Sequence, residues 1–469
     1  MTKFSPHLLL VLALSLLSGC GGGGNSSGGG PPPPPPPATQ FSINGPASSG
    51  AGFAFSFTVT ARDAENKLAA TYSGTVQFTS SDSAAVLPAN SKLTNGTGTF
   101  SATLASAGFQ TITATDTASA SLNGSLIVTA VAGEFPVSSF GAKGDGQTDD
   151  TAAIQSAINA ASGAGGGSVV LGLARYFTAG TLVVPAGVVL CGPSEGPFDV
   201  PGINPASTAI AATLLITNTS GPFITLQGIG AGVTDLLFHY PNQLAPTAGA
   251  PDVYPYTILV TAPGTKIARS TVTNAYNFLD IESGRVTAQD LFIGAFHNDI
   301  KIDHAYDHVT LRHLVHSVFW DIFANQPFPQ PIDTWVLNNG TALVVDRMDS
   351  LEVSDFFVFG RFAGILLADS TDASQNPTCG YGTGSDIDVE DVQYGIIATA
   401  SNTPGYKFTN VFLESHADIG QAAVQLRTGG SLPPKLLING VSQGGPAPWI
   451  DGAFPPPPVG ELVVVYPLP

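Results

Sequence analysis

Three short stretches decide the fold of this chain: residues 279–283 read LDIES, residues 298–304 read NDIKIDH and residues 320–325 read WDIFAN. Each contains the dipeptide Asp-Ile within a short strand-like run, and the dipeptide recurs after 19 and then 22 residues. Recurrence at about 20 residues is typical of a solenoid, in which each repeat forms one coil and neighbouring coils stack. The repeats therefore predict stacked β coils in this part of the chain.

A second repeated pattern, between residues 265 and 441, also indicates coils. It has apolar residues at the first and last of six positions and mostly turn-forming residues at the fifth. Asp, Asn and Gly tolerate a left-handed backbone, so we expect the fifth residues to form one column where successive coils turn. These residues are Thr271, Asp290, His313, Asp355, Asp391, Asn410 and Gly440.

The composition of the whole chain is consistent with β structure. Of its 469 residues, 43% are hydrophobic and 11% are charged, with 54 Gly and 37 Pro. This is too apolar for a disordered chain and too rich in turn residues for a helical one. The formal charge of −18 argues against nucleic acid or an anionic membrane surface as a partner. A polyanionic substrate would need a local basic patch.

The N-terminus has the pattern of a targeting segment. Lys3 precedes the apolar run of residues 8–17, and the sequence Leu-Ser-Gly-Cys then ends at Cys20. This sequence resembles the lipobox of bacterial lipoproteins, which implies a signal peptide over residues 1–20 and lipidation of Cys20. The apolar run is shorter than the roughly 20 residues of a spanning helix. The resemblance implies the outer membrane or the cell surface, with the lipid as the only membrane contact; an ordinary secretory signal is the alternative.

Two segments separate this signal from the coils. Residues 21–38 are rich in Gly and Pro, and we expect them to form a tether. Residues 39–131 alternate apolar and polar residues between turn signals, and they resemble bacterial Ig-like domains. We interpret this unit as a small β-sandwich that serves as a spacer or a weak adhesion module.

Residues 135–192 carry a further resemblance. They begin FPVSSFGAKGDGQTDDTAAIQSAI, which resembles the first segment of the pectate-lyase-like superfamily, in its polygalacturonase, rhamnogalacturonase and epimerase types. The resemblance implies a mostly β fold: a right-handed parallel β-helix, or single-stranded solenoid, over residues 134–469 with an N-terminal capping helix, preceded by the Ig-like β-sandwich. We expect Asp149 or Asp150 to cap that helix. Cys191 and Cys379 either pair in an oxidising compartment or stay free.

The candidate site follows from the alternation of side chains along a strand. With Ile281, Ile300 and Ile322 pointing inward, we expect Asp280, Asp299 and Asp321 to form an outward ladder with steps of about 4.8 Å. Such a ladder binds a cation such as Ca²⁺, raises the pKa of one carboxyl, or spreads into solvent. The spacing fits both a retaining and an inverting glycosidase. A solvated acidic face without a role is the alternative.

Other residues are expected around this ladder. Lys301 and Asp303 share the outward face of the second coil and are further catalytic candidates, and His297 and His304 flank that strand. Insertions in the coils often build binding grooves, and those of this chain contain aromatic residues that suit stacking on sugar rings. We therefore predict substrate binding by His297, His304, Tyr254, Tyr256 and Trp335.

These observations lead to two functional hypotheses. The first is a surface lipoprotein whose β-helix binds and cleaves an extracellular polysaccharide by hydrolysis or β-elimination, with a pectin-like polymer as one candidate substrate. The second is a non-catalytic carbohydrate-binding or adhesion protein. The motifs usual in polygalacturonase-type hydrolases are absent apart from a distant likeness at residues 297–299. A monomer is expected, with calcium as the candidate cofactor.

Overall fold

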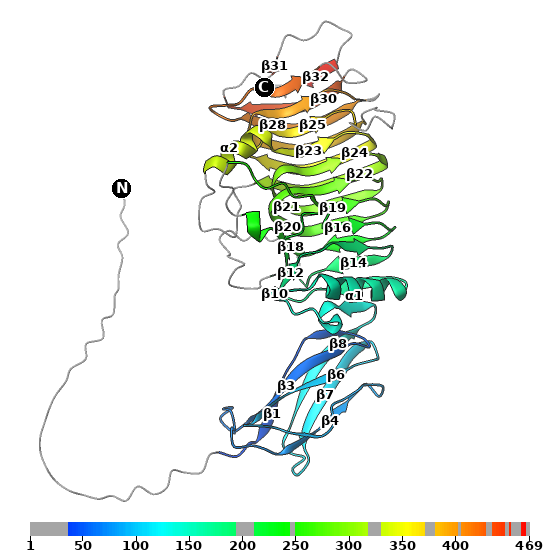
Figure 1. Ribbon diagram of the computed structural model, residues 1–469, viewed down its shortest axis with the longest axis vertical. Coiled ribbons are helices and arrows are strands. Elements are labelled where there is room, and N and C mark those ends of the chain that lie inside the picture. Colours follow the sequence, from blue (N-terminus) through cyan, green and yellow to red (C-terminus); the bar gives the residue numbers. More distant parts are fainter. Residues whose placement is uncertain are drawn as a thin grey trace, which may run out of the picture.

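A computed structural model of the protein describes residues 36–193, 211–243, 249–317, 330–370, 380–401, 405–427, 434–445, 450–451 and 461–465. Two β units follow each other along the long axis, with helix α1 (Thr151–Gly163) near their junction (Figure 1). The N-terminal unit is small and the second is a long stack of coils. In these residues, no helix is long and apolar enough to cross a membrane.

The N-terminal unit consists of two sheets that enclose a common core. Buried side chains such as Phe57, Val59 and Phe78 form this core, with alternate residues of the strands facing solvent. One sheet has the order β1 (Gln40–Asn44), β3 (Ala54–Arg62), β6 (Thr97–Thr103). The other has the order β2 (Ser48–Gly50), β8 (Asn123–Val131), β7 (Gly108–Asp116), β4 (Thr75–Ser80), β5 (Ser91–Lys92).

The second unit is a parallel β-helix, as the sequence predicted. In the described part of the chain its strands form one continuous sheet of 24 strands with parallel pairing between coils. The first strands are β9 (Glu134–Pro136), β10 (Asp145–Asp149), β11 (Gly167–Val170), β12 (Arg175–Thr178), β13 (Leu182–Val184), β14 (Val188–Cys191), β15 (Ala212–Ile216), β16 (Ile224–Leu226), β17 (Gly232–Thr234), β18 (Leu236–His239) and β19 (Tyr256–Val260). Short 3-10 turns span Val137–Phe140 and Pro241–Gln243.

Longer strands make up the later coils. They are β20 (Lys266–Ile281), β21 (Val286–Ile302), β22 (Ala305–Ser317), β23 (Thr341–Val345), β24 (Met348–Phe359), β25 (Ala363–Leu367), β26 (Gly382–Val392), β27 (Tyr394–Ala398), β28 (Tyr406–Ser415), β29 (Ala422–Leu426), β30 (Lys435–Gly444), β31 (Ile450–Asp451) and β32 (Glu461–Val465). Helix α2 (Gln330–Asn339) interrupts them between β22 and β23. Stacked aliphatic side chains from successive coils fill the interior.

The register of the coils differs from the one that the Asp-Ile repeats suggested. Leu279 pairs with Ile300, and Asp280 pairs with Lys301 instead of Asp299. The true repeat here is therefore 21 residues. Both registers place aliphatic residues inside, because a shift of two residues keeps every side chain on the same face of a strand.

The expected turn column exists, with two changes. Asp235, Arg269, Asp290, His313, Asp355, Asp386, Asn410 and Gly440 align from coil to coil and share a left-handed backbone. The prediction is thus confirmed for five of its members. It was wrong for Thr271 and Asp391, where Arg269 and Asp386 occupy the column. Pairs along the column bond one another: Arg269 with Asp235 at 2.7 Å, and His313 with Asp290 at 2.9 Å.

Helix α1 covers the first coils, and its two candidate capping residues have different roles. Oδ1 of Asp149 accepts a hydrogen bond from the Thr151 backbone N–H at 3.0 Å. Asp150 occupies the N-cap position, but its buried carboxylate accepts from the backbone N–H groups of Lys143 and Gly144 at 2.6 and 3.0 Å. Asp150 therefore fixes the loop before the helix.

Several predicted residues fall outside this description. Cys20, Asp321 and Cys379 lie beyond the described residues. Cys191, partly buried on β14, is a free thiol among the described residues.

We predict that Asp150→Ala lowers the free energy of unfolding by about 2 kcal/mol, because two buried backbone donors lose a carboxylate acceptor. Urea denaturation followed by circular dichroism measures this change. Asp252→Ala is the matched control, since Asp252 is exposed and its carboxylate makes no hydrogen bond or ion pair with a described residue. Equal stabilities of the two variants would contradict the assigned role of Asp150.

Candidate functional site

A cluster of carboxylates surrounds the ammonium group of Lys301. Nζ of Lys301 lies 3.3 Å from Oδ2 of Asp303 and 3.8 Å from Oδ2 of Asp346. Asp280 stands opposite Lys301 on the neighbouring strand β20. We call Asp280, Lys301, Asp303 and Asp346 the acidic cluster. Its side chains come from three successive coils and are mostly buried; the side chain of Lys301 is 25% exposed.

The stacking of the coils builds this cluster. Ile281, Ile302 and Val345 are aligned in successive strands, and each is followed by an acidic residue. The backbone N–H groups of Asp303 and Asp346 continue the ladder to the preceding coil at 2.9 and 2.8 Å. Their carboxylates therefore stack at the strand ends, while Asp280 and Lys301 stack one column inward.

Burial and charge shift the proton affinities within the cluster. Burial raises the pKa of Asp280 to about 6, although the Lys301 ammonium opposes this shift. Burial and the Asp303 charge raise the pKa of Asp346 to about 7. Burial alone would lower the pKa of Lys301, but the charges of Asp280, Asp303 and Asp346 more than compensate and raise it. Near neutral pH the cluster thus holds an exchangeable carboxyl proton beside a fixed ammonium ion.

Asp280 and Asp303 differ in how they are held. Oδ1 of Asp280 is buried and makes no hydrogen bond with a described residue. Asp303 accepts hydrogen bonds from the Ser370 hydroxyl at 3.1 Å and from the backbone N–H of His304 at 3.0 Å, besides its ion pair with Lys301. Asp303 therefore holds the side chains of the cluster in place. Oδ1 of Asp280, in contrast, can still accept a hydrogen bond.

Asp299 is not part of the cluster, so the expected outward ladder is wrong for this residue. Its side chain is fully buried and bonds Arg361 at 2.8 Å and His316 at 2.9 Å, both fully buried. Phe278 occupies the equivalent position in the neighbouring coil, and its side chain is buried too. Asp299 thus belongs to an interior ion cluster and not to a solvent-facing site.

An aromatic group lies on the same strands, a few residues before the acidic cluster. The rings of Tyr276 and His297 stack with centroids 5.0 Å apart and an interplanar angle of 15°. Trp335 of α2 approaches both rings, at 5.9 and 6.1 Å. Nδ1 of His297 lies 3.1 Å from Oδ1 of Asn277. Two predicted binding residues, His297 and Trp335, therefore meet on one surface.

The two tyrosines predicted to bind substrate have different environments. Tyr256 is half-buried on β19, where its hydroxyl accepts a hydrogen bond from Nδ2 of Asn298 at 3.3 Å and lies near Asp280. Tyr254 is buried and packs edge-on against Tyr240 with centroids 4.9 Å apart. The expected binding role of Tyr254 is wrong for this conformation, because its ring anchors the insertion to the coil.

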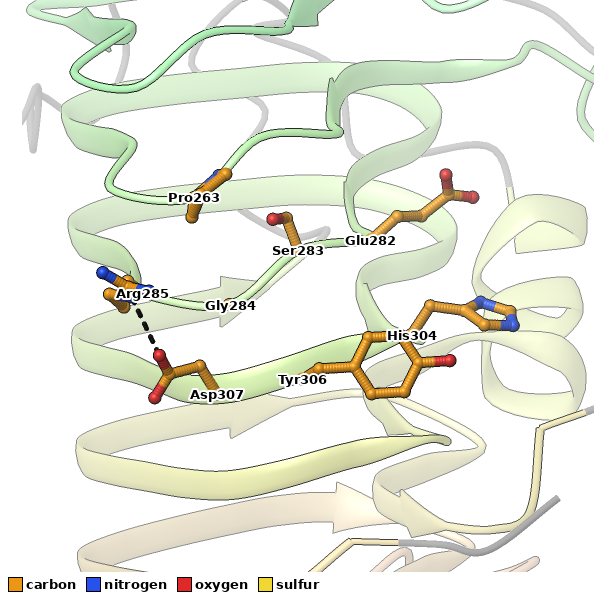
Figure 2. A pocket seen from close by; sticks show the side chains of 8 residues that line it. All are labelled: Pro263, Glu282, Ser283, Gly284, Arg285, His304, Tyr306 and Asp307. Carbon is orange, nitrogen blue, oxygen red and sulfur yellow. Dashed lines mark hydrogen bonds and ion pairs between the residues drawn. The ribbon is translucent and has the colours of Figure 1, made fainter. Parts of the chain in front are cut away.

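An open depression of about 470 Å³ adjoins the acidic cluster at the turns that follow strands β20 and β21 (Figure 2). Glu282 and His304 lie at one end of it, and the ion pair of Arg285 with Asp307, at 2.8 Å, lies at the other. Nδ1 of His304 is 3.4 Å from Oδ1 of Asp303, so the depression and the cluster are in contact. The lining residues are Pro263, Glu282, Ser283, Gly284, Arg285, His304, Tyr306 and Asp307.

Among the described residues, no three His, Cys, Asp or Glu side chains converge to hold a metal ion. Calcium binding through Asp280, Asp299 and Asp321 stays a prediction. The outward ladder of carboxylates on which it was based does not include Asp299, which lies in the interior.

Sequence reasoning missed Asp346, Tyr276 and Arg285. A signal for Asp346 was present, because the run Val-Val-Asp at 344–346 matches Lys-Ile-Asp at 301–303 once the coils are aligned. No comparable pattern marked Tyr276 or Arg285.

Comparison with known proteins supports the scaffold. Residues 135–221 match the family model described as rhamnogalacturonase A/epimerase, pectate lyase-like. The resemblance to the pectate-lyase-like superfamily is thereby confirmed over these residues. The match ends before the coils that carry the acidic cluster.

Individual relatives match over short segments. Alginate lyase 7 of Azotobacter vinelandii is 46% identical over 70 residues, which is 13% of this chain and 8% of that protein. Mannuronan C5-epimerase AlgE3 of the same organism is 57% identical over 47 residues, or 10% of this chain and 3% of that protein. The chain thus matches less than a tenth of the length of these relatives. The A-module of mannuronan C-5 epimerase AlgE4 aligns over 70% of this chain and 99% of the module, at 15% identity and a TM-score of 0.36.

The raised pKa of Asp280 predicts a stability that depends on pH. A folded-state pKa above the unfolded value means that the folded state favours the protonated carboxyl, so ionisation destabilises the protein as pH rises through about 6. Asp280→Asn should raise the free energy of unfolding at pH 8 by about 2 kcal/mol, and this gain should vanish near pH 4.

Asp299→Asn is the contrasting variant. It should lower the free energy of unfolding by about 3 kcal/mol, because the buried guanidinium of Arg361 loses its counter-charge. Chemical denaturation at both pH values measures the two effects. Destabilisation by Asp280→Asn at pH 8 would contradict the strained state of this carboxylate.

Proposed function

We propose that the β-helix binds an extracellular polysaccharide and cleaves it by acid–base chemistry at the acidic cluster. One observation carries this proposal: carboxyls of the acidic cluster gather around the Lys301 ammonium, and Asp303 of this cluster contacts His304, which lines an open depression. Burial in the cluster raises the pKa of Asp280 to about 6 and that of Asp346 to about 7. Strained titratable groups in a concave site are typical of catalytic positions.

Each part of the site has a role in such a reaction. Cleavage of a glycosidic bond needs a proton for the leaving oxygen, and a carboxyl with a pKa near 7 can supply it at neutral pH. Asp346 or Asp280 serves as this donor. Lys301 stabilises the carboxylate that remains after transfer, and Asp303 holds Lys301 in place. The depression and the aromatic group of Tyr276, His297 and Trp335 bind the sugar chain on the two sides of the cluster.

The comparisons support this proposal to a limited degree. The family model is named for enzymes of this kind, and the two A. vinelandii relatives are by name a lyase and an epimerase of polysaccharides. The matches lie in short segments, so the activity proposed for this chain depends on the cluster itself.

A second function, carbohydrate binding without cleavage, is favoured by the aromatic group alone. Flat rings that stack on sugars bind them whether or not a reaction follows. In that case the protein is an adhesion or carbohydrate-binding protein, and the cluster is only an acidic surface.

We also propose that the protein is anchored at the cell surface by a lipid on Cys20. The lipobox-like sequence and the Gly/Pro-rich tether of residues 21–38 support this location. A polysaccharide outside the cell would then lie within reach of the β-helix.

The activity is tested by incubating the purified protein with plant and bacterial polysaccharides. Released reducing ends report any cleavage, and absorbance of unsaturated products separates elimination from hydrolysis. We expect at least one of the variants Asp280→Asn and Asp346→Asn to lower kcat by about a hundredfold or more, since one of the two carboxyls donates the proton. Activity of the unaltered protein should fall as pH rises through about 6 to 7, where the carboxyls lose their protons.

Asp418→Asn is the control, because Asp418 is exposed and lies outside the site. It should retain full activity. Binding of polysaccharide without any product would leave only the adhesion function.

A further inference from the structure

We propose that the polysaccharide bound at this site is uncharged and is cleaved by hydrolysis, in contrast to the polyuronates after which the matched relatives are named. The inference rests on the proposed function and concerns the same site. It follows from the charges around the acidic cluster and the depression, where carboxylates outnumber the cations and the cations are already paired.

The cations of these coils are engaged by carboxylates. Lys301 contacts Asp303 and Asp346, so its ammonium already has protein carboxyls as partners. The remaining pairs join Arg285 to Asp307, Arg312 to Glu352, Arg347 to Asp349 and Arg361 to Asp299. A uronate would have to displace a protein carboxylate to reach any of these cations.

Two further cations of these coils, Arg269 and Lys266, lie outside the site. Arg269 is paired with Asp235 in the turn column, away from the cluster. Lys266 makes no ion pair with a described carboxylate, but it lies at the start of β20 and does not line the depression. Neither residue therefore offers a positive charge inside the site.

The segments that the structure does not describe add no basic residue to the β-helix. Within the β-helix they comprise residues 194–210, 244–248, 318–329, 371–379, 402–404, 428–433, 446–449, 452–460 and 466–469. Their sequences contain no Lys and no Arg, whereas they contribute acidic residues such as Glu195 and Asp321. A basic wall built by these segments is thus excluded by sequence.

The depression offers groups that suit a neutral sugar. Tyr306 is 51% exposed, and the guanidinium of Arg347 lies over its ring at 5.2 Å, which fixes the ring as a surface for stacking. Ser283, Glu282 and His304 provide hydrogen-bonding groups beside it. Sugar hydroxyls can donate to a carboxylate, whereas a sugar carboxylate would be repelled by Glu282 and Asp307.

Asp280 stands opposite Lys301 and does not itself line the depression; we assign it as the carboxyl that bonds such a hydroxyl or glycosidic oxygen. Only 9% of Asp280 is exposed to solvent, and its Oδ1 has no partner among the described residues. A protonated Asp280 donates to a ligand oxygen and an ionised Asp280 accepts from a ligand hydroxyl. A ligand carboxylate could satisfy only the protonated form.

The charge of the substrate also decides the reaction. β-Elimination removes the proton next to a sugar carboxyl, and an uncharged sugar lacks the carboxyl that acidifies this proton. Hydrolysis needs only water: its oxygen bonds the anomeric carbon, the bond to the glycosidic oxygen breaks, and that oxygen takes the proton of the carboxyl donor. The proton released by the water returns to the carboxylate pair, so atoms and charge balance.

The test uses polymers that differ only in their carboxyl groups. Polygalacturonate and polymannuronate are compared with their carboxyl-reduced counterparts, by reducing-end release and by affinity electrophoresis with the full chain. We expect binding and kcat/KM at least tenfold higher for a carboxyl-reduced polymer at low salt. Preference for a polyuronate, with or without Ca²⁺, overturns the inference and leaves the proposed cleavage intact. Binding without cleavage of a neutral polymer refutes the proposed catalysis but supports the assigned ligand class.

Charge variants provide a second measurement. Glu282→Lys should improve polyuronate binding at least threefold at low salt, and added salt should remove the gain, because it acts by charge. Asp418→Lys makes the same change of net charge at an exposed position outside the site. Equal gains from both variants, or equal affinities of both polymers for the unaltered protein, would refute control of specificity by the charge at this site.

Discussion

In-register stacking of parallel coils is the constraint on which the rest of this structure depends. Backbone hydrogen bonds fix each coil on the next, so a side chain meets its equivalent about 4.8 Å away in the neighbouring coil. A column of equal charges would repel itself at this distance. The chain relieves such columns in two ways: Lys301 stands opposite Asp280, and Val344 follows Lys301 in the next coil. The acidic cluster arises where this alternation is incomplete.

Carboxylates of the scaffold differ from Asp280 of the acidic cluster in the partners that their oxygens have. Asp235 in the turn column bonds Arg269, and Asp299 in the interior bonds Arg361 and His316. Each of these carboxylates has a cation or donor beside it. Asp280 has a buried oxygen with no described partner, which costs stability and has no structural use. This difference from Asp235 and Asp299 supports the proposal that Asp280 bonds a ligand.

The sequence predicted the scaffold better than the site, for a physical reason. Coil length, turn residues and inward aliphatic residues are repeated many times, so an error in one repeat does not change the fold. The site depends on the register of single residues, and a shift by two residues leaves the apolar pattern unchanged. Asp280 was thus matched with Asp299 when its neighbour is Lys301. The burial of Asp299 could not be read from the alternation of side chains, which places this residue on the outward face.

The position of the family match limits what it can say about the substrate. The described part of residues 135–221 forms the first coils and helix α1, at one end of the solenoid, and the range contains none of the cluster residues. Their glycines and aspartates serve turns and backbone bonds, as Asp150 shows. A match over residues with such duties follows the fold and not the chemistry of later coils. The substrate must therefore be inferred from the charges between residues 256 and 370, where carboxylates dominate and every lining cation is paired.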